Sequence, residues 1–308
     1  MARRRKKGRA VNGWLILDKP LGRTSTQALG TVKRLFDAQK AGHAGTLDPL
    51  ATGILPIAFG EATKTVPYAV DGEKAYRFTV TWGEERSTDD TEGEVVATSD
   101  KRPSADDIEA LLPRFIGEIS QTPPQFSAIK VDGNRAYDLA RDGETVELKA
   151  RTVVVTDLRL VGAPDADTAI LEAECGKGTY VRAIARDMGR ELGCHGHISE
   201  LRRLSVGSFT EEMAVSLDEL IAAHEEGGPE ALEPFLQPVE AALNNLTELF
   251  VSPSDAAELA RGKTVLLRGR DAPIFTGAFF ATCKGQLVAM GDAEKGQLRP
   301  HRVFNLGR

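Results

Sequence analysis

The stretch GHAGTLDPLATG, residues 42–53, does most to decide the fold and function of this chain. Its three glycines and one proline favour a tightly turned backbone, and we expect the wider segment 41–60 to be a loop. Leu47 and Leu50 can anchor that loop to a core and leave Asp48 displayed between them. An aspartate before a proline is usually a turn-forming residue, so the stretch alone does not separate a structural from a catalytic Asp48. It is not a phosphate-binding loop, because no Gly-Lys-Ser/Thr follows it and no helix opens at it.

Regular structure is expected on both sides of this loop. The residue patterns predict strands at about 13–20, 74–82, 93–98, 153–160 and 169–175, and helices at about 24–36, 104–115 and 180–192. A short helix is also expected at residues 137–141. These elements interleave without a regular βαβ period. We therefore predict an α+β fold with a mixed, largely antiparallel sheet flanked by helices.

The length of 308 residues allows one large domain or two unequal ones. We predict a basic flexible tail at residues 1–10, a main domain at 11–248 and a small β-rich domain at 249–308. An acidic stretch punctuated by Pro and Gly, residues 225–238, precedes the short β-like segments of the last part.

The formal net charge of −6 by itself argues mildly against a nucleic-acid partner. Phosphate binding needs only one positive face, however. Basic residues cluster at residues 3–7, at Lys33 and Arg34, at Arg182 and Arg186, and at Arg202 and Arg203. The acidic residues gather elsewhere, at residues 84–94 and 211–233. The charge pattern therefore permits RNA binding without requiring it.

Three scattered cysteines have no framework spacing, a pattern typical of a reducing, cytoplasmic setting. No apolar run is long enough to span a membrane, and no apolar segment follows the basic N-terminus as a secretory signal would require. Cys194, His195 and His197 lie close together in the chain, but no second pair of ligands stands at a useful spacing. We therefore predict no metal site.

The motifs of this chain, taken together, resemble those of one enzyme family, the TruB-type tRNA pseudouridine synthases. The stretch GHAGTLDPLATG, followed by LPIAFGEATK, is similar to the catalytic motif of that family. The other matching segments occur in the family's order: GWLILDKP, KAYRFTVTWG, TDDTEG, QTPPQFSAIKVDGNRAYDLAR, GKGTYVRAIARDMG and HISELRR. They cover most of residues 11–210, and a chance match to all of them in order is not credible. The resemblance implies a pseudouridine synthase catalytic domain and, more loosely, a PUA-like RNA-binding domain at 249–308.

The resemblance assigns the chemistry to Asp48, as the essential carboxylate that starts to break the N-glycosidic bond of a uridine. It implies that Arg182 pairs with Asp48, that Asp90 steadies Arg182, and that Tyr76 stacks on the flipped uracil. Without the resemblance, Arg182 reads as an exposed helix arginine and Tyr76 as a core aromatic. The residues leave open whether Asp48 adds to the base, attacks the sugar or abstracts a proton.

The other assigned residues belong to substrate binding. The resemblance implies that Tyr180 forms another side of the uracil pocket, that Leu201 forms its apolar floor, and that His43 fills the gap left by the extruded base. Three more residues are assigned from their places in the motifs: Lys19, Lys130 and Arg141. The last two are natural phosphate contacts.

The function that the resemblance implies is isomerisation of uridine 55 in the T loop of tRNA, after base flipping and without a cofactor or metal. The expected partner is tRNA, bound through its T arm and also its acceptor stem. No membrane or protein partner is expected, and the chain is expected to act as a cytoplasmic monomer.

Two alternatives stay open. One is the guide-RNA-dependent relative of this family, which shares the catalytic core; the chain's lack of long basic tails argues against it. The other is an RNA-folding factor whose chemistry is secondary. Because every expected catalytic position is filled, a purely non-catalytic role is disfavoured. RNA chaperone activity beside catalysis remains a hypothesis.

Overall fold

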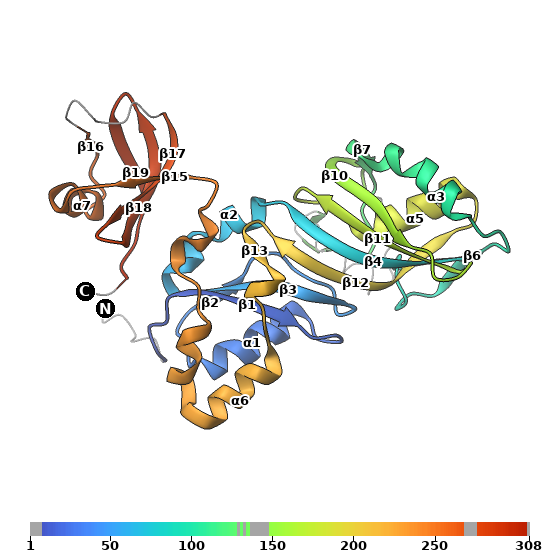
Figure 1. Ribbon diagram of the computed structural model, residues 1–308, viewed down its shortest axis with the longest axis horizontal. Coiled ribbons are helices and arrows are strands. Elements are labelled where there is room, and N and C mark those ends of the chain that lie inside the picture. The colour runs from blue at the N-terminus through green and yellow to red at the C-terminus, as the bar shows by residue number, and fades with distance from the viewer. Residues whose placement is uncertain (1–7, 128–129, 132–133, 136–147, 268–275, 307–308) are drawn as a thin grey trace.

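The computed structural model describes residues 8–127, 130–131, 134–135, 148–267 and 276–306. Two sheets dominate this part of the chain (Figure 1). The larger has ten strands in the order β14-β1-β3-β12-β4-β11-β10-β7, with β2 paired to β3 and β13 paired to β12. Only the pairs β1–β14 and β3–β12 are parallel among these strands. The prediction of a mixed, largely antiparallel sheet is confirmed.

The strands of the large sheet have these bounds: β1 Gly13–Lys19, β2 Ala41–His43, β3 Ala51–Phe59, β4 Lys74–Trp82, β7 Gly117–Gln121, β10 Arg151–Gly162, β11 Thr168–Cys175, β12 Gly196–Val206, β13 Phe209–Thr210 and β14 Val215–Ser216. The helices beside it are α1 Ser25–Leu35, α2 Val66–Asp71, α3 Ala105–Leu111, α5 Val181–Leu192 and α6 Leu217–Gly227. Helix α5 packs against β12 and β4, whereas α1 packs against β2 and α6. Two short hairpins are formed by β5 Glu84–Arg86 with β6 Val95–Thr98, and by β8 Lys130–Val131 with β9 Asn134–Arg135.

The segment 41–60 is not one loop as expected, because β2 and β3 occupy its two ends. Strand β3 lies inside the sheet between β1 and β12, and nearly all of its side chains are buried. A strand that is buried on both faces carries a continuous apolar run instead of alternating polar residues, so its pattern hid it. The loop is therefore confined to residues 44–50, between the two strands.

The helix beginnings follow from local chemistry. Thr24 caps α1: its hydroxyl accepts from the Gln27 backbone N–H, and the Gln27 side chain accepts from the Thr24 N–H. Ser104 caps α3 in the same way. The predicted helix 104–115 ends its α-helical part at Leu111, and a 3₁₀ turn, Leu112–Phe115, replaces the rest because Pro113 has no N–H to donate.

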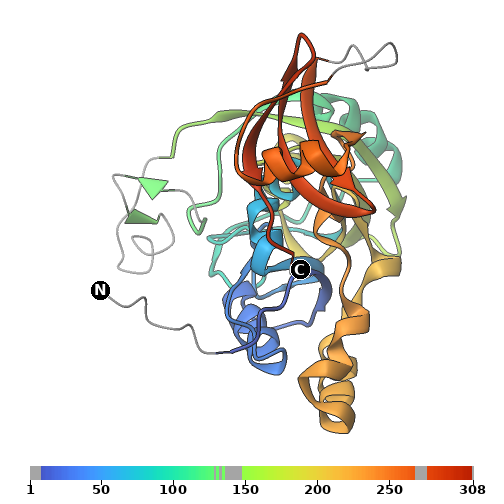
Figure 2. The same cartoon turned by 90° about the vertical axis from the view of Figure 1, so that its left-hand side faces the viewer.

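The second sheet has five strands, in the order β15-β17-β18-β19-β16. It lies beside the N-terminal part of the main sheet (Figure 2). Its elements are β15 Thr247–Phe250, α7 Pro253–Ala260, β16 Val265–Leu266, β17 Gly277–Cys283, β18 Gln286–Glu294 and β19 Gln297–Val303. It has a core of its own around Leu259, Phe279 and Leu298. The expected small β-rich C-terminal domain is confirmed, while its PUA-like character and the boundary at residue 249 remain predictions.

The two sheets share one buried cluster. Phe280, Met290 and Phe304 of the C-terminal part belong to the same cluster as Trp14 and Ile16 of β1. The chain end therefore packs on the large sheet, and does not hang from it on a linker.

Candidate active site

The loop that carries Asp48 is held at the residues on both sides of it. The Ser25 hydroxyl, at the start of α1, accepts from the Leu47 N–H at 2.8 Å and donates to the Leu47 carbonyl at 3.0 Å. The Gly22 N–H donates to the Pro49 carbonyl at 2.9 Å. Leu47 is buried, whereas the Asp48 side chain is 41% exposed. The loop thus presents a carboxylate to solvent from a fixed backbone.

Arg182 is the ion-pair partner of Asp48. Its Nη2 lies 2.9 Å from Asp48 Oδ2, and its Nη1 lies 3.3 Å from Asp90 Oδ2. The same two nitrogens donate to the carbonyls of Thr88 at 2.6 Å and Phe126 at 2.9 Å. The guanidinium and the Asp90 carboxylate are almost fully buried. Planar donors with four acceptors cannot rotate freely, so Arg182 is fixed with its positive charge beside the Asp48 carboxylate.

Lys19, at the end of β1, hydrogen-bonds to the backbone of the Asp48 loop and of the segment that follows β1. Its ammonium group is buried and donates to the carbonyls of Pro20 at 2.9 Å, Arg23 at 2.7 Å and Pro49 at 3.4 Å. Burial lowers the pKa of Lys19 to about 8, although the charge of Asp48 opposes this shift. Lys19 therefore acts on the residue next to Asp48.

Tyr76 lies on β4, beside β12, and is half-buried. Its hydroxyl lies close enough to the Arg203 guanidinium for the two groups to interact. Burial raises the pKa of Tyr76, and the positive charge of Arg203 opposes the rise. The tyrosine lies near enough to Asp48 for the two groups to interact electrostatically.

The other predicted pocket residues come from three elements. Tyr180 precedes α5, and its backbone N–H and carbonyl are both held by the Gln121 side chain, at 2.8 and 3.1 Å. Leu201 lies on β12, opposite Ala51 and Phe78, in the main core. His43 ends β2.

His43 carries a buried Nδ1 for which the described residues supply no hydrogen-bond partner. Burial, and secondly the charge of Arg203, lower the pKa of His43. The neutral imidazole is therefore favoured, which suits stacking better than proton donation.

Lys130 and Arg141 are the two predicted phosphate contacts. Lys130 begins strand β8, where only the backbone course is described. Arg141 and the helix expected at 137–141 lie outside the described residues.

Two arginines that the sequence argument did not assign belong to this site. Arg203 was treated only as part of a basic pair with Arg202. The alternation of a strand separates the two: Arg202 pairs with Asp18 and Glu211 near the surface, while Arg203 is 2% exposed. That alternation was readable from the sequence and could have identified Arg203 as the inward residue.

Arg186, one helical turn beyond Arg182, is the second missed residue. Its guanidinium pairs with Asp89 at 2.9 Å and donates to the Thr122 carbonyl at 2.8 Å. Burial raises the pKa of Asp89 to about 6. Arg182 and Arg186 therefore hold the same two segments, 88–90 and 122–126, against α5. The spacing of four residues on a helix was the available signal.

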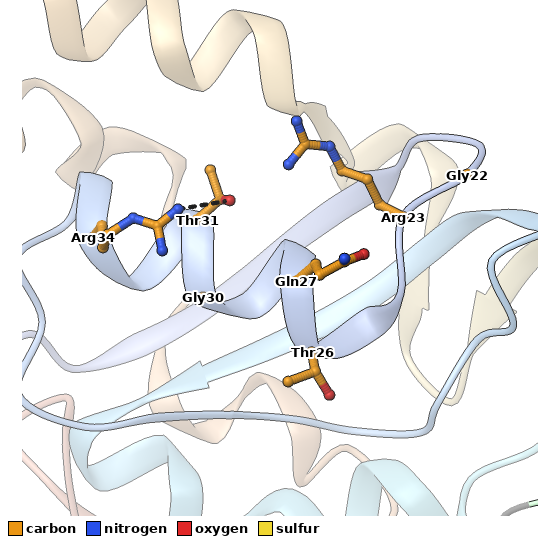
Figure 3. A pocket seen from close by; sticks show the side chains of 7 residues that line it. All are labelled: Gly22, Arg23, Thr26, Gln27, Gly30, Thr31 and Arg34. Carbon is orange, nitrogen blue, oxygen red and sulfur yellow. Dashed lines mark hydrogen bonds between the residues drawn. The ribbon is translucent and has the colours of Figure 1, made fainter. Parts of the chain in front are cut away.

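A shallow basic pocket adjoins the Asp48 loop. It lies along α1 and is lined by Gly22, Arg23, Thr26, Gln27, Gly30, Thr31 and Arg34 (Figure 3). Arg34 donates to Thr31 at 3.2 Å, and neither arginine pairs with a carboxylate in the described part of the chain. Gly22, at one end of this pocket, donates to the Pro49 carbonyl and so connects the pocket to the residue that follows Asp48.

Comparison with known families decides the membership of this chain. The TruB family pseudouridylate synthase N-terminal domain matches residues 33–181, and the tRNA pseudouridylate synthase B C-terminal domain matches residues 182–244. The chain belongs to the TruB family of pseudouridylate synthases. Asp48, Tyr76 and Asp90 lie in the first matched region, and Arg182 begins the second.

Full-length relatives agree with this membership. The chain is 59% identical to a tRNA pseudouridine synthase B of Agrobacterium fabrum, over 98% of this chain and 97% of the relative. It is 56% identical to one of Brucella melitensis, over the full length of both. This TruB-family chain is therefore an enzyme of the pseudouridine synthase class.

Solved structures show the same fold. A chain of a Cbf5–Nop10–Gar1 complex is 27% identical with a TM-score of 0.73, covering 95% of this chain and 84% of its own. A chain of an H/ACA RNP bound to a substrate RNA containing 2′-deoxyuridine is 25% identical with a TM-score of 0.74, covering 95% of this chain and 85% of its own. This structural likeness covers both sheets.

None of the described helices of the TruB-family chain is long and apolar enough to cross a membrane. Within the same residues, no group of three or more His, Cys, Asp and Glu side chains is placed to hold a metal ion.

Proposed function

We propose that this enzyme isomerises uridine 55 in the T loop of tRNA to pseudouridine, with Asp48 as the essential carboxylate. The observation that carries the proposal is the pairing of a 41% exposed carboxylate with an arginine that is itself almost fully buried. The buried guanidinium places a fixed positive charge beside the Asp48 carboxylate, and the exposure leaves that carboxylate free to meet a substrate. The names of the full-length relatives supply the substrate class, tRNA.

The uridine reaches Asp48 only after leaving the RNA stack. Extrusion of a base costs a few kcal/mol, which contacts in the pocket offset. In the proposed arrangement Tyr76 stacks on the uracil, Tyr180 and Leu201 line the pocket, and His43 takes the vacated place in the RNA. The half-buried Tyr76 and the neutral His43 suit these apolar stacking roles.

The T arm approaches across the basic pocket on α1. Arg23 and Arg34 lack carboxylate partners within the described residues, and Gly22 of the same pocket bonds to Pro49 beside Asp48, so phosphates near the flipped base can reach the pocket. Lys130 and Arg141 are proposed as further phosphate contacts, and the C-terminal sheet as the part that meets the acceptor stem. The enzyme is proposed to act as a cytoplasmic monomer, without a cofactor or partner protein.

The decisive experiment maps pseudouridine by position in an unmodified tRNA transcript after incubation with the purified protein. Modification at position 55 is expected with wild type and is expected to be abolished by Asp48→Asn, while tRNA binding stays within about 3-fold, because the phosphate contacts remain. Asp106→Asn, on the exposed first turn of α3, is the matched control and should be fully active. Modification elsewhere in the tRNA, or near wild-type turnover by Asp48→Asn, would contradict the proposal.

The α1 contact has its own test. Arg23→Gln combined with Arg34→Gln should weaken tRNA binding and reduce the dependence of log Kd on log salt by about one to two charges, because fewer counterions are released. Arg159→Gln, far along the sheet on β10, should leave both quantities unchanged. An unchanged salt slope in the double variant would remove the α1 face from the binding surface.

RNA folding activity is proposed as a secondary role, because a surface that binds the T arm can act on tRNA without catalysis. Asp48→Asn should then still accelerate tRNA folding. Absence of acceleration by the wild-type protein would end this idea.

A further inference from the structure

Arg203 is a buried cation with an unusual set of partners. The residue is 2% exposed, and no carboxylate of the described chain lies within ion-pair distance of it. Burial lowers the pKa of Arg203 accordingly. Burying a charge without an opposite partner destabilises a protein by several kcal/mol. An aliphatic side chain would fill the same space without that cost. The position of Arg203 therefore calls for a reason other than packing.

Its hydrogen bonds reach both ends of the Asp48 loop. Nε donates to the Ile54 carbonyl at 2.7 Å, and Nη2 donates to the Gly45 carbonyl at 3.1 Å. Gly45 precedes Asp48, and Ile54 follows the loop on β3. A Cβ on Gly45, which has φ +91°, would lie 3.3 Å from Nη1 of Arg203. The loop backbone is thus folded closely onto the guanidinium.

The guanidinium also interacts with the Tyr76 hydroxyl on the neighbouring strand. In the sheet, Arg203 on β12 stands opposite Gly53 on one side and Tyr76 on the other. A phenol oxygen that accepts from an arginine keeps its own proton free to donate elsewhere. One planar fork therefore fixes the loop of Asp48 and the orientation of the Tyr76 hydroxyl together.

We propose that Arg203 is a positioning residue that couples the Asp48 loop to Tyr76 and directs the Tyr76 O–H toward the bound nucleoside. The inference rests on the proposed uridine isomerisation and adds a residue that acts through two others. It places the hydroxyl, and not only the ring, of Tyr76 in the catalytic arrangement. The positive charge of Arg203 would also stabilise negative charge that develops nearby during turnover.

The test is a double-mutant cycle between Arg203→Lys and Tyr76→Phe, measured by single-turnover rates on tRNA. Arg203→Lys keeps the charge and loses the fork. It should lower the single-turnover rate constant about 10-fold or more and change the affinity for tRNA by no more than about 3-fold, since an ordering defect acts on the chemical step. In the Tyr76→Phe background the same substitution should cost about 3-fold or less, because the shared hydrogen bond is already gone.

Arg202→Lys is the matched control, because Arg202 is the adjacent residue and its partners are Asp18 and Glu211. Its rate should equal that of wild type. Equal losses from Arg203→Lys with and without the Tyr76 hydroxyl would overturn the coupling.

If the Arg203 variant does not fold, Tyr76→Phe alone decides the question: a wild-type rate would overturn the proposal, and a loss of about 10-fold or more would support it. If the coupling between Arg203 and Tyr76 is absent but Asp48→Asn is inactive, the proposed function stands. Active Asp48→Asn would instead remove that function itself.

Discussion

Lys19 shows how one buried side chain can link pH to both stability and activity. Its pKa falls from the ordinary 10.5 to about 8, so the unfolded chain binds a proton that the folded protein has released between those values. Stability contributed by this group should therefore rise with pH across that window. The slope should disappear in Lys19→Met. Urea unfolding of both proteins at about pH 7 and about pH 9.5 measures it, and parallel changes in the two would contradict the assignment.

Activity should move the other way in the same window. The ammonium form of Lys19 serves three carbonyls, and the neutral amine has only two N–H donors left. The longest bond, to Pro49 at 3.4 Å, is the one expected to be lost, and Pro49 follows Asp48 directly. Wild-type kcat should decline as pH rises through about 8. A flat kcat from about pH 7 to about pH 9.5 would show that the Pro49 contact is not needed.

At the scale of elements, the residue patterns predicted four of the ten strands of the large sheet, β1, β4, β10 and β11, and the family resemblance predicted the ion pair of Asp48 with Arg182. Strand β4 begins and ends where the alternation of residues 74–82 placed it, and the predicted helices 24–36 and 104–115 begin at the caps Thr24 and Ser104. Strand β3 escaped because burial on both faces removes alternation. The bonds of Arg203 to Gly45 and Ile54 could not be predicted, since they depend on which strands lie next to one another.

The junction between α1 and the Asp48 loop makes an element-scale prediction. Ser25→Ala removes the hydroxyl that serves both the N–H and the carbonyl of Leu47, which leaves buried polar groups unpaired. We expect a loss of about 1–3 kcal/mol in the free energy of unfolding. We also expect a roughly 10- to 100-fold fall in kcat, because the carboxylate is displaced.

The neighbouring Thr24→Ala is the control for that variant. It removes only the helix cap, at a cost of about 1 kcal/mol, and does not touch the loop. Its kcat should remain that of wild type. If both variants lose the same activity, helix stability and not loop position governs the rate.

At the scale of the whole molecule, the C-terminal sheet is tied to the large one at the end of β19. Phe304 is 6% exposed and belongs to the buried cluster that contains Trp14. Lys64 lies over its ring and donates to the Val303 carbonyl at 2.7 Å, and the Asn305 N–H donates to Glu61 at 2.7 Å. These contacts hold the C-terminal sheet against the large sheet.

Phe304→Ala should loosen this junction without disturbing the Asp48 site. The substitution removes a buried ring, which costs up to about 3–5 kcal/mol in a core, and the C-terminal sheet should unfold before the rest. The variant should bind full-length tRNA more weakly, so KM for tRNA should rise several-fold. A T-arm hairpin that does not reach the C-terminal sheet should react as it does with wild type. Phe250→Ala, at an 80% exposed position of the same sheet, should change neither substrate. Equal losses on tRNA and hairpin would mean that the C-terminal sheet supports the fold of the catalytic part and does not enlarge the RNA surface.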